Sequence, residues 1–165
     1  MDSDQWVWDD PEIDDADYLY RRIKRADNIV AIDPMTKQAQ LLPLAFKYDE
    51  GSGVSLCVGS LAERANMQIA NFASWETHAL AYVTAQVPRT SETGERTGFS
   101  GVVPDPIEEN AAHGLVRVQS TAAVRSQEHR RQWLPVRSRL LELASYVSDL
   151  ASVDGTPTSP RCITS

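Results

Sequence analysis

The sequence predicts a single α+β domain, in which helices pack on a small mixed or antiparallel sheet and an amphipathic helix lies near the C-terminus. The chain has 165 residues, of which 42% are hydrophobic and 24% charged, as is typical of one globular domain. Short apolar runs rich in strand formers alternate with turn signals, and one late segment has apolar residues at helical spacing. We expect the globular part to span residues 18–151.

Residues 1–17 differ from the rest of the chain in charge. They hold eight acidic residues and no Lys or Arg, and since the whole chain has a net charge of −7, residues 18–165 carry +1. This composition predicts an acidic disordered leader, because such a segment has little to bury. Trp6 and Trp8 lie within it, and they would either bind a partner or cover the core of the domain.

Alternating and apolar runs predict the strands. The expected strand segments are 18–23, 28–32, 40–46, 54–58, 79–87, 102–103 and 115–118. Pro43 places the segment 40–46 at a sheet edge, because proline cannot donate a backbone hydrogen bond. The alanines of 79–87 leave a helix open as the alternative.

Two segments have the pattern of helices. Ser60 and Glu63 form a capping box, which predicts a helix over 61–72. A second helix is expected over 135–151, where apolar residues recur at helical spacing and Pro135 suits a first helical turn.

The remaining segments bear on disorder and location. Residues 90–100 are polar and predict a mobile or partner-facing loop, whereas 152–165 predict a disordered tail. Cys57 and Cys162 are the only cysteines, so the sequence indicates neither a disulfide framework nor a metal site, and it favours a cytoplasmic location. We expect no secretory signal and no contact with a membrane.

A set of short segments carries a resemblance to known proteins. The segments are Leu19-Tyr20-Arg21-Arg22-Ile23, Ala45-Phe46, Val54-Ser55-Leu56, Pro104 to Pro106 and Ala112-His113-Gly114. Their order resembles that in a family of short bacterial proteins with a Leu-Tyr-Arg-Arg opening, an Ala-Phe step, a Ser-Val strand and a late Ala-His segment. The resemblance covers residues 18–145 and implies one domain of shared architecture. No activity is attached to that family, so it implies no catalytic role.

Histidine side chains can bind a metal ion or transfer a proton, and the chain has three of them. His78, His113 and His129 lack the spacing of zinc ligands, so we expect neither a metal nor a cofactor. Glu108, Glu109 and Asn110 precede His113 on an expected exposed loop, where a carboxylate could orient its imidazole for proton transfer. Alternatively, Asn110 and His113 close the turn that leads into the next strand.

If the protein is an enzyme, the candidate catalytic residues are Arg21, Ser55, Glu109 and His113. The order of Arg21, Ser55 and Glu109 resembles that of ADP-ribosyltransferases and related NAD-consuming toxins. The resemblance implies that Arg21 grips a pyrophosphate and that Glu109 stabilises a ribosyl cation. The sequence has no Gly-x-Ser-x-Gly elbow, phosphate-binding loop or dinucleotide motif, which argues against common hydrolases, kinases and NTPases.

Residues 117–139 contain six arginines and a single acidic residue, and therefore carry a net charge of +5. Arginines beside Trp133 could bind single-stranded nucleic acid, although most charge runs are solvated helix faces. The candidate partner-binding residues are Trp6, Trp8, Arg125, Arg130, Arg131, Trp133 and Arg137.

The sequence favours a non-enzymatic binding or accessory protein that contacts a macromolecular partner, most simply another protein. The acidic leader would either fold over the arginines and compete with an anionic partner, or mimic phosphate and occupy the basic groove of a partner. An enzyme and a nucleic-acid-binding module are the alternatives. The first requires that the four catalytic candidates share one cleft, and the second requires that the arginines and Trp133 share one exposed face.

Overall fold

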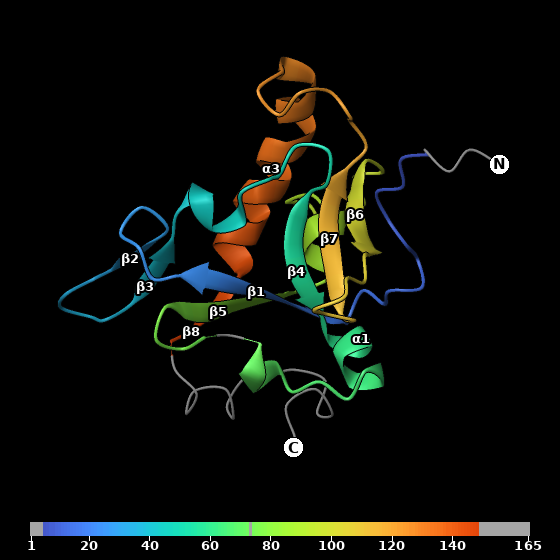
Figure 1. Cartoon of the computed structure of the whole chain (residues 1–165). Coiled ribbons are helices and arrows are strands. Elements are labelled where there is room, and N and C mark those ends of the chain that lie inside the picture. Colours follow the sequence, from blue (N-terminus) through green and yellow to red (C-terminus); the bar gives the residue numbers. More distant parts are fainter. Residues whose placement is uncertain (1–4, 73, 149–165) are drawn as a thin grey trace.

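The computed structural model describes residues 5–72 and 74–148, and its centre is a six-stranded antiparallel sheet with the order β6-β7-β4-β1-β5-β8 (Figure 1). The strands of this sheet are β1 (Tyr18–Lys24), β4 (Val54–Val58), β5 (His78–Thr84), β6 (Ser100–Pro104), β7 (His113–Val118) and β8 (Ser145–Val147). A small second sheet pairs β2 (Val30–Ile32) with β3 (Ala39–Leu41). The predicted α+β class is confirmed, and the sheet is antiparallel. None of the helices in the described part is long and apolar enough to span a membrane.

The large sheet divides where β1 meets β4. These strands pair only at Leu19 with Val58 and at Tyr20 with Cys57, and beyond these pairs they separate. As a result β1 and β5 run steeply across the direction of β4, β7 and β6 (Figure 1). The C-terminal part of β1 and the N-terminal part of β4 therefore form the two arms of a fork.

The two faces of the sheet bury different clusters. The larger cluster includes Phe46 of the 3-10 helix η1 (Pro43–Phe46) and Trp133, Val136 and Leu140 of helix α3 (Gln127–Leu143). The smaller cluster, on the opposite face, is built around Tyr20, Cys57, Ile69 and Leu80. Side chains alternate in direction along a strand, so Leu19 and Ile23 face the larger cluster whereas Tyr20 faces the smaller one.

The predicted helix over 61–72 is much shorter in the structure. Helix α1 covers Gly59–Arg64, and only a 3-10 turn, η2 (Ile69–Asn71), follows. Asn66 has a φ of 58°, a left-handed conformation that ends a helix. The capping role of Ser60 is also wrong, because its backbone N–H and its hydroxyl donate to the Asp17 carboxylate.

The C-terminal helix also differs from its prediction. Helix α3 begins eight residues before Pro135, where the Ser126 hydroxyl caps it by accepting from the His129 N–H at 3.1 Å. It ends at Leu143, because Val147 is buried in β8 opposite Leu80 of β5. The predicted tail, 152–165, and the last residues of the predicted domain lie outside the described residues.

The prediction of a disordered leader is wrong for residues 5–17, which lie along β6 (Figure 1). The Trp6 indole N–H donates to the Val118 carbonyl at 2.8 Å, and the Asp10 N–H donates to the Val102 carbonyl at 2.9 Å. Ile13 is buried in the larger cluster. Residues 5–17 therefore belong to the folded domain.

Arg89 explains why this acidic segment is ordered. It lies at the end of the short helix α2 (Gln86–Arg89) and is only 3% exposed. Its Nε donates to Asp9 Oδ1 and its Nη1 to Asp15 Oδ1, both at 2.8 Å. The same guanidinium donates to the Ile13 and Asp10 carbonyls. We call these contacts the Arg89 clamp.

Electrostatics and packing support this clamp. Burial alone would raise the pKa of the Asp15 carboxyl, but Arg89 and Arg96 outweigh it and hold that pKa below its usual value. Gly101 of β6 leaves room for the leader, because a Cβ at this position would collide with the Asp9 carboxylate. The segment 90–100, predicted as a mobile or partner-facing loop, contributes Arg96 to the contact with Asp15.

Candidate functional site

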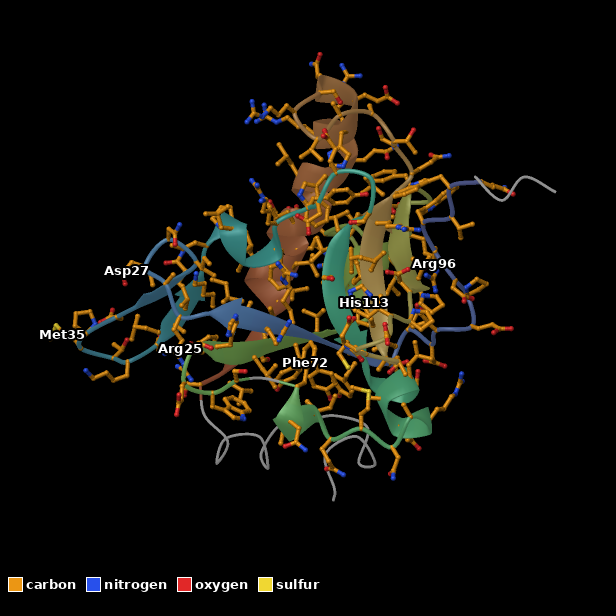
Figure 2. The ribbon with its side chains drawn as sticks, in the orientation of Figure 1. Arg25, Asp27, Met35, Phe72, Arg96 and His113 are labelled. Atoms are coloured by element: carbon orange, nitrogen blue, oxygen red, sulfur yellow. The ribbon has the colours of Figure 1, made fainter. Side chains whose placement is uncertain are left out.

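A cleft of about 440 Å³ lies at the fork between β1 and β4. Arg21, Ser55, Glu109 and His113 all line it, so the four catalytic candidates from the sequence share one cleft. The turns around Phe72 and the loop between β6 and β7 contribute further walls. Figure 2 shows Phe72 and His113 near the point where the two arms of the sheet meet.

Ser55 and His113 lie on one face of neighbouring strands. In the register of β4 and β7, Ser55 pairs with Leu115 and Cys57 pairs with His113, so Ser55 and His113 are diagonal neighbours. The Ser55 Oγ and the His113 Nε2 form a hydrogen bond. A hydroxyl and an imidazole are therefore in direct contact at the cleft wall.

Asp105 completes this arrangement on the far side of the imidazole. The His113 Nδ1 lies 2.8 Å from the Asp105 carbonyl oxygen and 3.1 Å from its carboxylate Oδ2. Because two oxygen acceptors face Nδ1, we assign the imidazole proton to this nitrogen. Nε2 is then the acceptor, and the Ser55 hydroxyl donates to it. The order Ser55, His113 and Asp105 is that of a nucleophile, its base and the group that orients the base.

The loop between β6 and β7 is shaped to hold His113 in place. The Asp105 N–H donates to the His113 carbonyl at 2.8 Å, and the Asn110 side-chain oxygen accepts from the Ala112 N–H at 2.9 Å. Gly114 lets the strands close, because a Cβ there would lie 2.6 Å from a Val58 methyl carbon. The turn-closing role predicted for Asn110 is present together with the oriented imidazole.

Arg21 lines the cleft, but two of its guanidinium nitrogens donate to backbone carbonyls. Its Nε donates to the Ala45 carbonyl and its Nη1 to the Ser55 carbonyl, both at 2.6 Å. Burial lowers the pKa of the Arg21 guanidinium, and Asp49 partly offsets that effect. The guanidinium thus bridges the gap where β1 and β4 separate, and it fixes the backbone of Ser55.

This geometry weakens the comparison with ADP-ribosyltransferases. Two of the Arg21 nitrogens are occupied by backbone carbonyls, so they are not free for a bidentate grip on a pyrophosphate. Glu109 lies exposed on a turn closed by the Ile107–Asn110 bridge, and not on a strand.

Asp105 is the site residue that the sequence analysis missed. It lies between Pro104 and Pro106, where it has the pattern of an ordinary turn. The hairpin register offered a signal, because pairing Pro104 with Gly114 brings Asp105 beside His113. Only the tertiary pairing of β4 with β7 then adds Ser55.

The predicted partner-binding residues do not gather on one surface. Arg125, Arg130 and Arg131 line a hollow of about 490 Å³ at the start of α3, and Arg137 is half-buried further along. Trp133 is only 3% exposed and packs on Tyr48, with ring centroids 5.0 Å apart. The expectation that Trp133 shares an exposed face with these arginines is wrong, because it belongs to the core.

The two leader tryptophans contact the domain itself. The Trp6 ring lies 4.1 Å from the Arg117 guanidinium carbon, and Trp8 is half-buried beside Arg89 and Arg96. The leader carboxylates pair with Arg89 and Arg96, which lie outside the predicted basic stretch. Of the two roles left open for the tryptophans, covering the domain is the one seen for Trp6.

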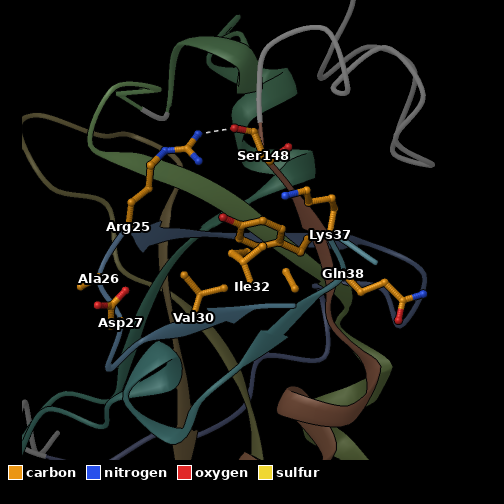
Figure 3. A pocket seen from close by; sticks show the side chains of 10 residues that line it. Arg25, Ala26, Asp27, Val30, Ile32, Lys37, Gln38 and Ser148 are labelled. Carbon is orange, nitrogen blue, oxygen red and sulfur yellow. Dashed lines mark hydrogen bonds between the residues drawn. The ribbon is translucent and has the colours of Figure 1, made fainter. Parts of the chain in front are cut away.

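A larger hollow of about 770 Å³ lies beneath the β2–β3 hairpin (Figure 3). Its charged side chains are Arg25, Asp27 and Lys37, and Arg25 donates to the Ser148 carbonyl. Among the described residues that line it there is no histidine, cysteine or second carboxylate. Across the described ranges, no group of three or more His, Cys, Asp or Glu residues could hold a metal ion.

Comparison with known proteins supplies no relative from which a role could be transferred. No family model matches the chain, and no curated protein or solved structure matches it either. The role of the cleft must therefore be argued from its own side chains.

Proposed function

We propose that this protein is a hydrolytic enzyme that cleaves an ester-like bond with Ser55 as its nucleophile. The observation that carries this proposal is the contact order Ser55, His113 and Asp105 in an open cleft. The same order of hydroxyl, imidazole and carboxylate recurs on unrelated folds, and it is recognised by geometry rather than by a sequence motif. The missing Gly-x-Ser-x-Gly elbow therefore does not exclude it.

The chemistry needs only water as a co-reactant. The Ser55 Oγ attacks the carbonyl carbon of the substrate while its proton moves to the His113 Nε2. The bond to the leaving group then breaks, and His113 returns the proton to that group. In the second half, His113 takes a proton from water, the resulting hydroxide attacks the acyl carbon, and Ser55 Oγ leaves with the proton. The Asn71 and Asn110 side chains line the cleft and could donate to the developing oxyanion.

This proposal replaces the preference for a purely accessory protein that the sequence suggested. The acidic leader was expected to fold over the basic stretch or to occupy the groove of a partner, but its Asp9 and Asp15 carboxylates pair with Arg89 and Arg96. Trp133, which was to stack on a base, is buried. The catalytic candidates, by contrast, meet in one cleft.

The direct test is hydrolysis of para-nitrophenyl acetate and para-nitrophenyl butyrate. We expect turnover by the wild-type protein and a loss of about a hundredfold or more in Ser55→Ala and in His113→Gln. Ser138→Ala is the matched control, because Ser138 is exposed on α3 and does not line the cleft. Circular dichroism spectra of all variants would verify folding. Equal rates in the wild-type protein and Ser55→Ala would rule the proposal out.

A second candidate function is binding of an acidic protein segment at the start of α3. In the part of the chain that the structure describes, Arg125, Arg130 and Arg131 form no ion pair, and Leu134 adds an apolar floor to the hollow between them. Charged groups without counterions attract an anionic partner. No exposed aromatic ring lines this hollow, so a peptide with acidic and apolar residues fits it better than nucleic acid bases.

This second function can be tested separately from catalysis by fluorescence anisotropy of a labelled peptide of alternating Glu and Leu. We expect binding that weakens with added salt and is lost in the variant with Arg130→Glu and Arg131→Glu. Arg64→Glu, at the exposed end of α1, is the control for charge alone. Tighter binding of a labelled oligothymidine than of the peptide would instead favour nucleic acid.

A further inference from the structure

Arg22 is a positively charged group that the proposed reaction does not use, although it lines the same cleft as Ser55. It follows Arg21 on β1, and its side chain lies on the Tyr20 side of the sheet, where Phe72 packs. The pairing of Tyr20 with Cys57, continued by two residues, would set Arg22 opposite Ser55. The fork between β1 and β4 thus brings a cation to the edge of the nucleophile's cleft.

The Arg22 guanidinium is oriented but not neutralised. Its central carbon lies 5.3 Å from the centroid of the Phe72 ring, a cation–π contact that leaves its N–H groups available. Within residues 5–72 and 74–148, no carboxylate lies at ion-pair distance from it. A guanidinium held in this way is a ready site for a carboxylate or a phosphate, whose oxygens match its planar fork.

The surroundings are also electropositive. Burial lowers the pKa of His78, which lines the same cleft, and the charges of Arg22, Lys24 and Arg25 lower it further. Among the described residues that line the cleft, Glu109 is the only one with a carboxylate. A cationic substrate would therefore be repelled at the end where Arg22 lies.

We infer that the substrate of this enzyme carries an anionic group, either a carboxylate or a phosphate, which binds Arg22 while the bond to be cleaved lies at Ser55. The binding of an anion at Arg22 does not depend on the proposed hydrolytic function, whereas the placement of the bond to be cleaved at Ser55 rests on it. Arg22 is then a specificity-determining residue, because it anchors the substrate and takes no part in bond breaking.

Anion binding can be measured without turnover, in the Ser55→Ala protein, by calorimetric titration with inorganic phosphate and with succinate. We expect saturable binding of at least one anion, and whichever binds more tightly identifies the class. Adding Arg22→Gln should weaken that binding about tenfold or more, as expected for loss of a charge-assisted hydrogen bond. The control Lys24→Gln removes an exposed charge two residues away on the same strand and should weaken it by no more than about twofold.

Turnover gives the second arm, with neutral para-nitrophenyl acetate compared with anionic mono-para-nitrophenyl succinate. We expect a higher kcat/KM for the anionic ester, and we expect Arg22→Gln to reduce this preference about tenfold, mainly through KM. If neither ester is hydrolysed but an anion still binds in a manner that depends on Arg22, the hydrolytic function is overturned and the anion site stands. Hydrolysis with the same preference in Arg22→Gln and Lys24→Gln would overturn the anion site but keep the hydrolytic function.

Discussion

At the scale of single residues, the site depends on which way one imidazole is turned. His113 contacts Asp105 through Nδ1 and Ser55 through Nε2. Asp105 contributes two acceptors, its backbone carbonyl and its carboxylate, so the ring is held even when one of them is lost. The carboxylate differs from the carbonyl in that it would also stabilise the positive charge that His113 gains in the proposed reaction.

We therefore expect Asp105→Asn to lower kcat for ester hydrolysis about tenfold or more, while the backbone contact preserves the orientation of the ring. The loss should be smaller than in His113→Gln, because the base itself remains. Initial rates of para-nitrophenyl acetate hydrolysis at several substrate concentrations give kcat. Asp27→Asn is the control, because Asp27 is exposed. Unchanged kcat in Asp105→Asn would show that the carboxylate has no part in the reaction.

A second residue-scale prediction concerns His129, which is buried at the start of α3 against the Tyr48 ring. Neither of its ring nitrogens has a hydrogen-bond partner among the described residues. Burial lowers the pKa of His129, and the charge of Glu50 partly opposes this. Below its ordinary pKa of about 6.5, the unfolded chain therefore binds more protons than the folded one, and stability falls as the pH falls.

His129→Phe should remove this contribution and flatten the loss of stability between about pH 6.5 and about pH 5, above the range where carboxylates titrate. Urea unfolding at several pH values in this window measures it. His78→Asn is the comparison, since His78 is less buried and should account for less of the loss. An equally steep decline in His129→Phe would contradict the account.

At the scale of elements, the features set by neighbouring residues could be predicted from the sequence, and those set by distant residues could not. The strands β1, β4 and β5 follow from runs of β-branched, aromatic and apolar residues, which need no distant information. The predictions of a Ser60 cap and of a disordered leader were wrong because their determinants are remote. Asp17 satisfies the donors of Ser60, and Arg89 binds the leader from a position far along the chain.

The same distinction applies to the site. The sequence identified Ser55, Glu109 and His113 as residues with suitable chemistry. Their residue types are common, however, and the sequence does not show whether their side chains lie close together. Their convergence depends on the pairing of β4 with β7 and on the separation of β4 from β1. Asp105 was missed because a short Pro-Asp-Pro segment has the same pattern whether or not a histidine lies beside it.

The Arg89 clamp gives the prediction at this scale. Arg89→Met should destabilise the fold by about 3 kcal/mol or more, because it leaves carboxylates and carbonyls of the leader without their buried donor. Arg96→Met should cost less than about 1 kcal/mol, since Arg96 is 59% exposed. Urea unfolding gives both values, and hydrogen exchange of residues 5–17 shows whether the leader is released. A leader that stays equally protected in Arg89→Met would be evidence against the clamp.

At the scale of the whole molecule, the antiparallel sheet consists of two arms joined by a short pairing between β1 and β4. The main core and α3 cover one face, and the leader lies along the β6 edge (Figure 1). The other face holds the smaller cluster, and the cleft opens where the arms diverge. The fold thus leaves one concave site where a nucleophile, a base and a cation meet.

The most direct test of this account is reaction of the intact protein with diisopropyl fluorophosphate, followed by mass spectrometry of its peptides. The reagent forms a bond between phosphorus and an activated serine oxygen and releases fluoride. We predict a single adduct on Ser55 in the wild-type protein and none in His113→Gln at the same time point. A wild-type protein without an adduct on Ser55, or equal labelling in His113→Gln, would contradict the central claim that His113 activates Ser55.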